Sequence, residues 1–166
     1  MKKIVIVLAI IITILSINKE DKVIIPKESI RFRIIGNSNK EVDQNLKKEI
    51  VKEISKDLVL PSNVNIEDAR SIIKKSIPKY EETINNTLKK NNIEESFSIN
   101  YGKNYFPKKE YKGITYEEGE YESLVIKLGD AKGKNFWCVL FPPICMVEDD
   151  NIEYKSLIKE IINKYF

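Results

Sequence analysis

The first regular pattern in the chain is an alternation of apolar and basic residues over Ser29 to Ile35. Its members are Ile30, Arg31, Phe32, Arg33 and Ile34. Successive side chains of a strand point to opposite faces, so a period of two predicts a β-strand. One face of this strand is expected to be apolar, and the other to carry two cations.

Helical periods follow this strand. The run Gly36-Asn37-Ser38-Asn39 breaks it and offers capping side chains for a helix of about Asp43 to Leu58, in which Asp43 and Lys47 are spaced to pair on the wet face. Asn65 is typical of the start of a second helix, which carries isoleucines up to Ile77. Pro78 lacks an amide hydrogen, so we expect a break or kink there and a third helical piece over about Tyr80 to Lys90.

Beyond Asn92 the pattern changes back to a period of two. It predicts strands around Phe97 to Tyr101, from Tyr121 to Leu128 and from Phe136 to Phe141, the last of which ends at Pro142-Pro143. The turn residues Asp130 to Gly133 predict an antiparallel hairpin between the last two strands. Trp137 and Phe141 are four residues apart, so we expect them to share a strand face, with core packing as their default role.

A final helical stripe includes Ile152, Leu157, Ile158, Ile161 and Ile162. The expected order is therefore β-α-α-α-β-β-β-α. This order indicates an α+β fold, a single domain in which a mostly antiparallel sheet is packed by several helices.

The amino-terminal residues 1–18 form a separate unit. Lys2 and Lys3 precede an apolar run from Ile4 to Ile17, the layout of a signal peptide. The cleavage signal is weak because only Ser16 is small, so a retained amino-terminal anchor is the alternative. Either reading places the chain from about residue 19 outside the cytoplasm, with the folded domain over residues 29–166.

Export changes the interpretation of the two cysteines, Cys138 and Cys145. Outside the cytoplasm a pair at this spacing favours a structural disulfide. The alternative is two reduced cysteines packed as small apolar side chains. A zinc site is disfavoured, because two thiolates without histidine do not complete four ligands.

Charge and composition exclude several classes of function. Without Lys2 and Lys3 the 28 basic residues fall to 26 against 25 acidic ones, which argues against nucleic acid and against a polybasic grip on membranes. The chain has no histidine, so it lacks an imidazole base and a His-containing triad or metal motif. Glu117, Glu118 and Glu120 lie beside a turn and are expected to be a solvated acidic loop. We expect no enzymatic activity, no cofactor, no metal and no small-molecule substrate.

Binding features are better supported by the sequence. Arg31 and Arg33 share one strand face and could hold carboxylates of a partner through planar, bidentate contacts; a solvated strand face is the alternative. Tyrosines and phenylalanines are also spread over the second half, as at many interaction surfaces.

Two blocks of sequence together resemble the stage II sporulation protein R family. The first is Arg31-Phe32-Arg33-Ile34-Ile35-Gly36-Asn37-Ser38, followed by Asp43-Gln44 and Leu46-Lys47. The second begins with Tyr105-Phe106-Pro107, continues through Tyr111, Gly113, Tyr116, Gly119, Tyr121, Ser123-Leu124 and Gly129, and ends with Gly133 and Asn135-Phe136-Trp137-Cys138-Val139-Leu140-Phe141-Pro142-Pro143 and Cys145. The resemblance runs from about Ile30 to Cys145.

The resemblance implies an exported signal that is made in the forespore and acts in the space between the two membranes. Its implied partner is a membrane-embedded aspartic-type protease of the mother cell, stage II sporulation protein GA, which processes the precursor of sigma factor E. We expect the partner-binding residues to be Arg31, Arg33, Asn37, Ser38, Tyr116, Tyr121, Trp137, Phe141, Pro142 and Pro143. The alternatives are a membrane-anchored structural protein of the spore envelope and a hydrolase that uses carboxylates alone.

Overall fold

The computed structural model describes residues 23–58, 60–61, 63–111, 114–144 and 154–166, with only the backbone for residues 154–157. The expected leader, residues 1–18, lies outside this range. The elements are β1 (Val23–Ile24), β2 (Ile30–Ile35), α2 (Glu41–Asp57), α3 (Ile66–Lys90), β3 (Phe97–Phe106), β4 (Lys109–Tyr111), β5 (Ile114–Tyr116), β6 (Gly119–Leu128), β7 (Asn135–Phe141) and α4 (Tyr154–Tyr165). The predicted α+β class is confirmed.

The main sheet has four strands in the order β3-β6-β2-β7. Strand β2 is parallel to β6 and antiparallel to β7, while β3 is antiparallel to β6. The strand predicted from the Ile30–Ile34 alternation is thus an inner strand. Its apolar side chains Ile30, Phe32 and Ile34 are fully buried, which is the reason this strand occupies the middle of the sheet.

The predicted hairpin between β6 and β7 is wrong, because β2 lies between these two strands. The loop that joins them passes over the end of β2 and is tied to it by backbone hydrogen bonds. Lys132 N donates to Asn37 O at 2.9 Å, and Gly133 N donates to Gly36 O at 2.8 Å. The turn residues correctly indicated that the chain reverses direction between β6 and β7. They carry no information about a third strand inserted between these two strands.

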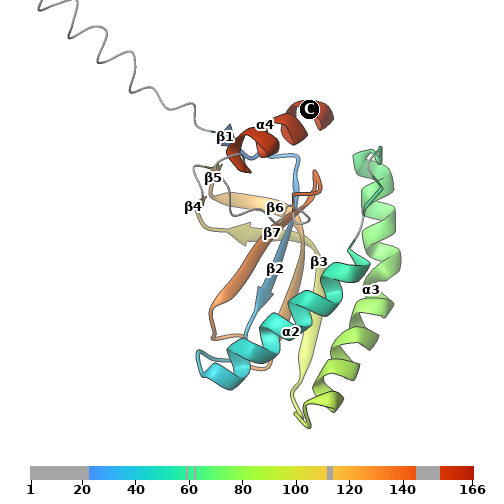
Figure 1. Ribbon diagram of the computed structural model, residues 1–166, viewed down its shortest axis with the longest axis vertical. Helices are drawn as coiled ribbons and strands as arrows, with labels where there is room; N and C mark the ends of the chain where they lie inside the picture. Colours follow the sequence, from blue (N-terminus) through green and yellow to red (C-terminus); the bar gives the residue numbers. More distant parts are fainter. Residues whose placement is uncertain (1–22, 59, 62, 112–113, 145–153) are drawn as a thin grey trace, which may run out of the picture.

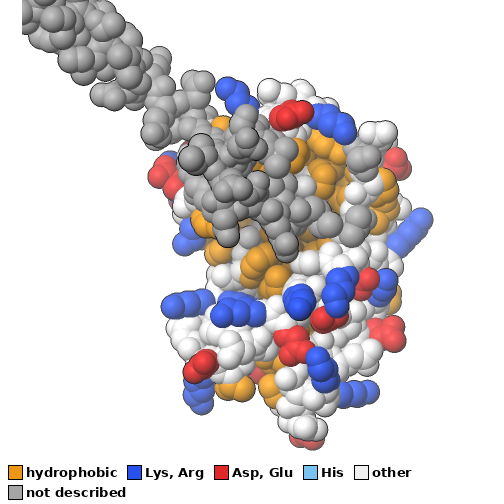
Figure 2. Space-filling view, in the orientation of Figure 1, with side chains coloured by type: hydrophobic (Ala, Val, Ile, Leu, Met, Phe, Trp, Pro, Cys, Tyr) orange, Lys and Arg blue, Asp and Glu red, His pale blue; other side chains and the backbone are white. Residues whose placement is uncertain are grey.

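Helices α2 and α3 pack on one face of this sheet (Figure 1). The apolar stripe of α2 includes Leu46, Ile50 and Ile54, which join Phe32 and Ile126 of the sheet in one buried cluster. Figure 2, which looks onto this side, shows basic and acidic side chains mixed over the visible face. This mixture agrees with the nearly balanced charge of the sequence.

The predicted break at Pro78 is wrong, because α3 runs without interruption from Ile66 to Lys90. Pro78 is exposed, so the carbonyl that would accept its missing hydrogen bond can bind water instead. Buried Ile73 and Tyr80 on either side hold the helix against the sheet. Asn65 caps the helix as expected, since its side chain accepts a hydrogen bond from Asp68 N at 2.9 Å.

The expected details at the start of α2 are only partly correct. The residue at its amino-terminal cap is Lys40, which has no side-chain capping bond. Lys47 does not pair with Asp43: its Nζ donates to Lys134 O at 2.6 Å and to Gln44 Oε1 at 2.7 Å, and the residue is buried. Lys47 thus fastens α2 to the loop between β6 and β7.

A second, three-stranded sheet has the order β1-β5-β4. Its strands are two or three residues long, too short for a periodic signal, and the sequence did not predict them. Val23, Ile25, Ile114 and Ile158 of α4 form its core together with Val139 of β7. Within the described part of the chain, no helix combines the length and apolarity that a membrane span requires.

Candidate functional site

The face of the main sheet opposite α2 and α3 carries both predicted arginines. On β2, Arg31 lies between Ser123 of β6 and Val139 of β7, and Arg33 lies between Val125 and Trp137. Ile35 follows on the same face and packs with Val125. The predicted division of β2 into an apolar face and a cationic face is therefore confirmed.

Three aromatic rings alternate with the two guanidinium groups on this face. The Arg31 Cζ atom lies 3.3 Å from the ring centroid of Tyr121 and 5.6 Å from that of Phe106. The Arg33 Cζ atom lies 5.2 Å from the centroids of both Phe106 and Trp137. We call these five residues the arginine–aromatic stack. The negative ring faces attract both cations, which explains how two like charges are held side by side.

Arg31 is buried without a carboxylate. It is 2% exposed, and its Nη1 donates a hydrogen bond to the backbone oxygen of Glu117 at 3.2 Å. Its Nε and Nη2 atoms are buried and have no hydrogen-bond partner in the described structure, and the same is true of Arg33 Nε. Burial lowers the pKa of both guanidinium groups. Buried donors of this kind lose hydration without compensation until an acceptor reaches them.

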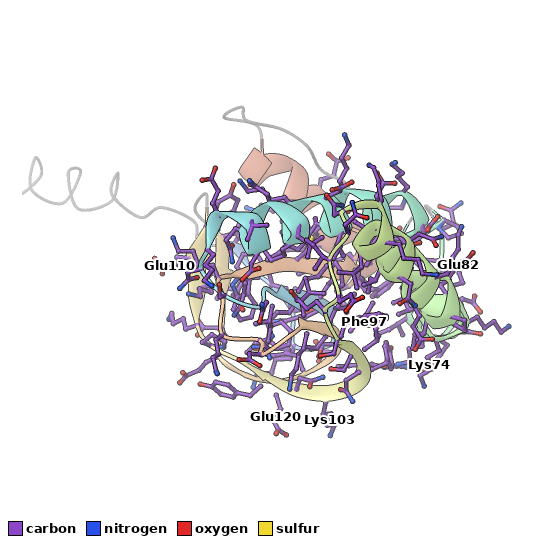
Figure 3. The ribbon with its side chains drawn as sticks, turned by 90° about the horizontal axis from the view of Figure 1, so that it is seen from below. Lys74, Glu82, Phe97, Lys103, Glu110 and Glu120 are labelled. Carbon is purple, nitrogen blue, oxygen red and sulfur yellow. The ribbon has the colours of Figure 1, made fainter. Side chains whose placement is uncertain are left out.

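Arg31 forms part of the wall of a cleft with a volume of about 460 Å³. The cleft lies between β7 and β4, and we call it the β4–β7 cleft. It is lined by Arg31, Phe106, Pro107, Lys109, Glu110, Tyr111, Tyr116, Asn135, Phe136, Trp137, Cys138 and Ile144. In Figure 3, Glu110 of β4 lies at the opposite end of the view from Lys74 and Glu82 of α3, and no residue of this helix lines the cleft.

The structure brings together Arg31, Arg33, Tyr116, Tyr121 and Trp137 of the predicted binding residues. Tyr121 and Trp137 belong to the arginine–aromatic stack, and Tyr116 lines the β4–β7 cleft. Tyr121 also donates a hydrogen bond to Glu117 O at 3.0 Å, the same oxygen that accepts from Arg31. This shared acceptor fixes the Tyr121 ring over the Arg31 guanidinium.

Asn37 and Ser38 lie elsewhere, at the end of β2 where the loop between β6 and β7 passes. Asn37 Oδ1 accepts from Asp130 N at 3.0 Å, and Ser38 Oγ donates to Asp43 Oδ2 at 2.5 Å. Both side chains are used to hold this corner together. They form no part of the β4–β7 cleft.

Phe141 lies on the helical side of the sheet, and the expectation that it shares a face with Trp137 is wrong. Strand β7 contains a bulge: Val139 is opposite Arg31 and Phe141 is opposite Ile30, so Leu140 has no opposite residue. The extra residue reverses the alternation beyond it. Phe141 packs in the main core, with ring centroids 5.2 Å from Tyr165 and 6.1 Å from Phe166.

Pro142 and Pro143 follow at this end of β7 and do not line the β4–β7 cleft, and Ile144 N donates back to Pro142 O at 2.7 Å. Cys138 lines the β4–β7 cleft, whereas Cys145 lies outside the described residues. The bridge between these two cysteines therefore stays a prediction.

Sequence reasoning did not single out Phe106, Lys109 or Asn135 as site residues. Phe106 is the central ring of the stack, with centroids 6.2 Å from Tyr121 and 5.4 Å from Trp137. The period of two in β3 places Phe106 on the face opposite Phe97, Ile99 and Tyr101. In the folded sheet this is the face that carries Arg31. The positions of Lys109 and Asn135 could not be predicted. Lys109 lies in a strand of three residues and Asn135 at the start of a strand, where the side-chain alternation cannot be recognised.

A second and larger cleft of about 820 Å³ lies near the end of α4. Figure 2 shows apolar side chains gathered in this area, beside the carboxyl terminus. Arg70, which lines this cleft, donates to Glu122 Oε2 at 2.8 Å and also pairs with Glu67. Tyr101 donates to Glu122 Oε1 at 2.6 Å. Arg70 of this cleft is thus paired with carboxylates, unlike Arg31 of the β4–β7 cleft.

The composition of the β4–β7 cleft is suited to recognition. Among the described residues, no group of three or more aspartates, glutamates or cysteines could hold a metal ion. What the β4–β7 cleft offers is aromatic area and guanidinium donors. These are the residue types that dominate the centres of protein interfaces.

Comparison with known proteins gives two matches. The model of the family described as stage II sporulation protein R matches residues 26–151. A protein named stage II sporulation protein R from Bacillus subtilis (strain 168) is 36% identical over 138 residues, which are 82% of this chain and 62% of that protein. The chain thus spans less than two thirds of the length of this relative. No solved structure matches the chain.

Proposed function

Because the chain belongs to the stage II sporulation protein R family, we propose that it is an exported signalling protein of endospore formation. In this proposal it is made in the forespore, and residues 1–18 direct it into the space between the two membranes. There it activates the membrane-embedded protease stage II sporulation protein GA, which processes the precursor of sigma factor E. The bond-breaking chemistry belongs to the protease.

The observation that carries the proposal is the position of the cleft within the family match. Residues 26–151 contain every residue that lines the β4–β7 cleft and the whole arginine–aromatic stack. This part of the chain presents buried donors and rings to the outside of the sheet. Such a surface is suited to a protein partner.

Activation requires that the chain bind one state of the protease more tightly than another. A ligand shifts a conformational equilibrium only by its differential affinity for the two states. We propose that the β4–β7 cleft binds a segment of the protease that is accessible only when the protease is in its active state.

The test is reconstitution in a host that does not sporulate. The chain, its cognate protease and the sigma-factor precursor are expressed together, and the size of the precursor is followed by immunoblot. We expect processing only when all three proteins are present. A catalytically dead protease serves as the control for cleavage by the host.

An intact precursor in the presence of all three folded proteins would contradict direct activation. The alternative of a membrane-anchored envelope protein would then be favoured. A second strain, in which residues 1–18 are replaced by an unrelated cleavable signal peptide, distinguishes the two further. A secreted signal keeps its activity after this exchange, whereas an anchored envelope protein requires its own leader.

A further inference from the structure

The β4–β7 cleft contains two buried polar groups that the described protein leaves without partners. One is Arg31, whose Nε and Nη2 donors are unbonded. The other is Asn135, whose Oδ1 acceptor is buried and unbonded. In folded proteins buried polar atoms are nearly always paired, so two exceptions in one cleft point to a ligand that supplies both an acceptor and a donor.

The donors of Arg31 define the acceptor. A guanidinium presents its N–H groups in a planar fork that matches a carboxylate. Lys109, on the neighbouring β4 wall, adds a second positive charge, and its Nζ lies 5.9 Å from the ring centroid of Trp137. Glu110 is the acidic residue of the lining, and its side chain is exposed at the rim. Lys109 is exposed as well, so the lining carries two cations, Arg31 inside and Lys109 outside, against one anion.

The other walls define what surrounds the carboxylate. Phe106, Tyr116, Phe136 and Trp137 line the cleft with rings, and Ile144 adds an aliphatic side chain. Asn135 and Arg31 lie on neighbouring strands but four register positions apart, because Ile35 is opposite Asn135 and Val139 is opposite Arg31. At roughly 3.4 Å per residue, four positions correspond to a groove of about 14 Å, or four extended residues.

We propose that the β4–β7 cleft binds an extended acidic segment of the protein partner. An aspartate or glutamate side chain of that segment lies on Arg31, apolar neighbours pack against the rings, and a backbone N–H near the other end donates to Asn135 Oδ1. This inference rests on the proposed function for the identity of the partner. It adds the chemical class of the segment that is recognised.

The single tryptophan of the chain provides a direct readout, because Trp137 lines the cleft. The purified domain is titrated with the blocked tripeptide Ac-Leu-Glu-Leu-NH2 and with its uncharged match Ac-Leu-Gln-Leu-NH2. Blocked ends leave the side chain as the only carboxylate. We expect a saturable change of Trp137 fluorescence with the Glu peptide, and at least tenfold weaker binding of the Gln peptide.

Variants assign the charge discrimination to the cleft. Arg31→Met keeps the length of the side chain and removes the donors, so it should abolish the preference for the Glu peptide. Lys127→Met is the matched control, because Lys127 is an exposed cation on the same face of β6 and does not line the cleft. If circular dichroism shows that Arg31→Met is unfolded, Lys109→Glu replaces it. Lys109 is exposed, and a negative charge at this wall should repel the Glu peptide alone.

Three results would overturn the inference: no fluorescence change with either peptide, equal affinity for both, or displacement of the Glu peptide by inorganic phosphate at similar concentration. The last would indicate a general anion site. In the reconstitution, an intact precursor with the wild-type chain contradicts the proposed function. Normal processing with the wild type and equally with a folded Arg31→Met or Lys109→Glu variant contradicts the role given to the cleft, both here and in the activation step, and leaves the signalling function itself standing.

Discussion

At the scale of single residues, the main finding is a buried arginine that is held by rings. Arg31 is almost inaccessible, and its guanidinium faces Tyr121 at 3.3 Å with no acidic partner among the described residues. The ring face offsets part of the cost of burying the charge. The unpaired Nε and Nη2 donors reduce the stability of the domain, but they can still bind an acceptor from outside. The arrangement is therefore better suited to binding than to stability.

Gly133 is a residue whose size is decisive. A Cβ atom there would lie 2.3 Å from Ser38 O and 2.8 Å from Gly36 O, both of them backbone atoms. We expect Gly133→Ala to lower the free energy of unfolding by roughly 2 kcal/mol, because the loop must move off the end of β2. Urea denaturation measures the change.

Gly102→Ala is the control for this substitution. The atom nearest to its Cβ position is Asn100 Oδ1 at 3.9 Å, so an alanine fits in β3 and should stabilise slightly. Equal destabilisation of both variants would contradict the close contact at Gly133 as the cause of the effect.

Glu95 provides a test of stability against pH. Burial, and then the charge of Asp43, raises the pKa of Glu95 above its ordinary value of 4.5, and its Oε1 has no hydrogen-bond partner among the described residues. A carboxyl whose pKa is raised by folding stabilises the fold fully below the unfolded pKa, and this contribution is lost as the pH rises through the folded pKa. Above that pH the charged form opposes folding.

We therefore expect Glu95→Gln to be more stable than the wild type at pH 7, and this gain to vanish below about pH 4. Thermal unfolding followed at several pH values measures the difference. Glu94→Gln, which changes an exposed neighbour, is the matched control. A gain for Glu95→Gln that is the same at every pH would contradict the electrostatic explanation.

At the scale of elements, packing overrides local signals at Pro78. A proline inside a helix removes one hydrogen bond and costs about 3 kcal/mol relative to alanine. Here α3 continues because Ile73, Tyr80 and Ile84 are buried on the sheet on both sides of the proline. The apolar stripe decides the length of the helix, and the proline only weakens it.

Pro78→Ala should consequently stabilise the domain by roughly 1 to 3 kcal/mol, because it restores an N–H donor at an exposed position. The midpoint of urea unfolding measures the gain, with Lys75→Ala as an exposed control in the same helix. A loss of stability would mean that a bend imposed by the proline is required for the packing of Tyr80.

At the scale of the whole molecule, the amino-terminal end of the described chain belongs to the fold. The sequence predicted a domain that begins at residue 29, but strand β1 lies before this boundary. Val23 pairs with Ile114 of β5, and Ile25 N donates to Thr115 O at 3.0 Å. Val23 and Ile25 are both buried in the core below α4.

A chain that starts at Ser29 should be less stable than one that starts at residue 19, by roughly 3 kcal/mol for two buried aliphatic side chains. Chemical denaturation of the two purified proteins measures this difference. A chain that starts at residue 23 retains β1 and serves as the control. If all three have equal stability, β1 contributes little to the fold.

Much of the fold could be predicted because several elements are periodic and long. The alternation in β2 and the stripe of α2 identified both elements to within a few residues. The β6–β7 hairpin, the break at Pro78 and the shared face of Trp137 and Phe141 were wrong for one common reason. Each depends on a neighbour distant in sequence: an inserted strand, a supporting sheet, or a bulge opposite Arg31.

The same division holds for the candidate site. Both arginines on one face of β2 followed from the period of two alone. Tyr121, Phe106 and Trp137 come from three other strands, and their assembly around the arginines depends on the strand order β3-β6-β2-β7. No local pattern contains that order.

The sequence by itself thus determined the class of fold, the two-faced character of β2 and membership of the stage II sporulation protein R family. The reason is that side-chain period and motif order are written along the chain. The tertiary structure alone decided that Arg31 is buried among rings, that its donors stay unpaired within the described protein, and that it lines a cleft against β4. These properties arise from contacts between distant segments, where packing and desolvation set the free energy.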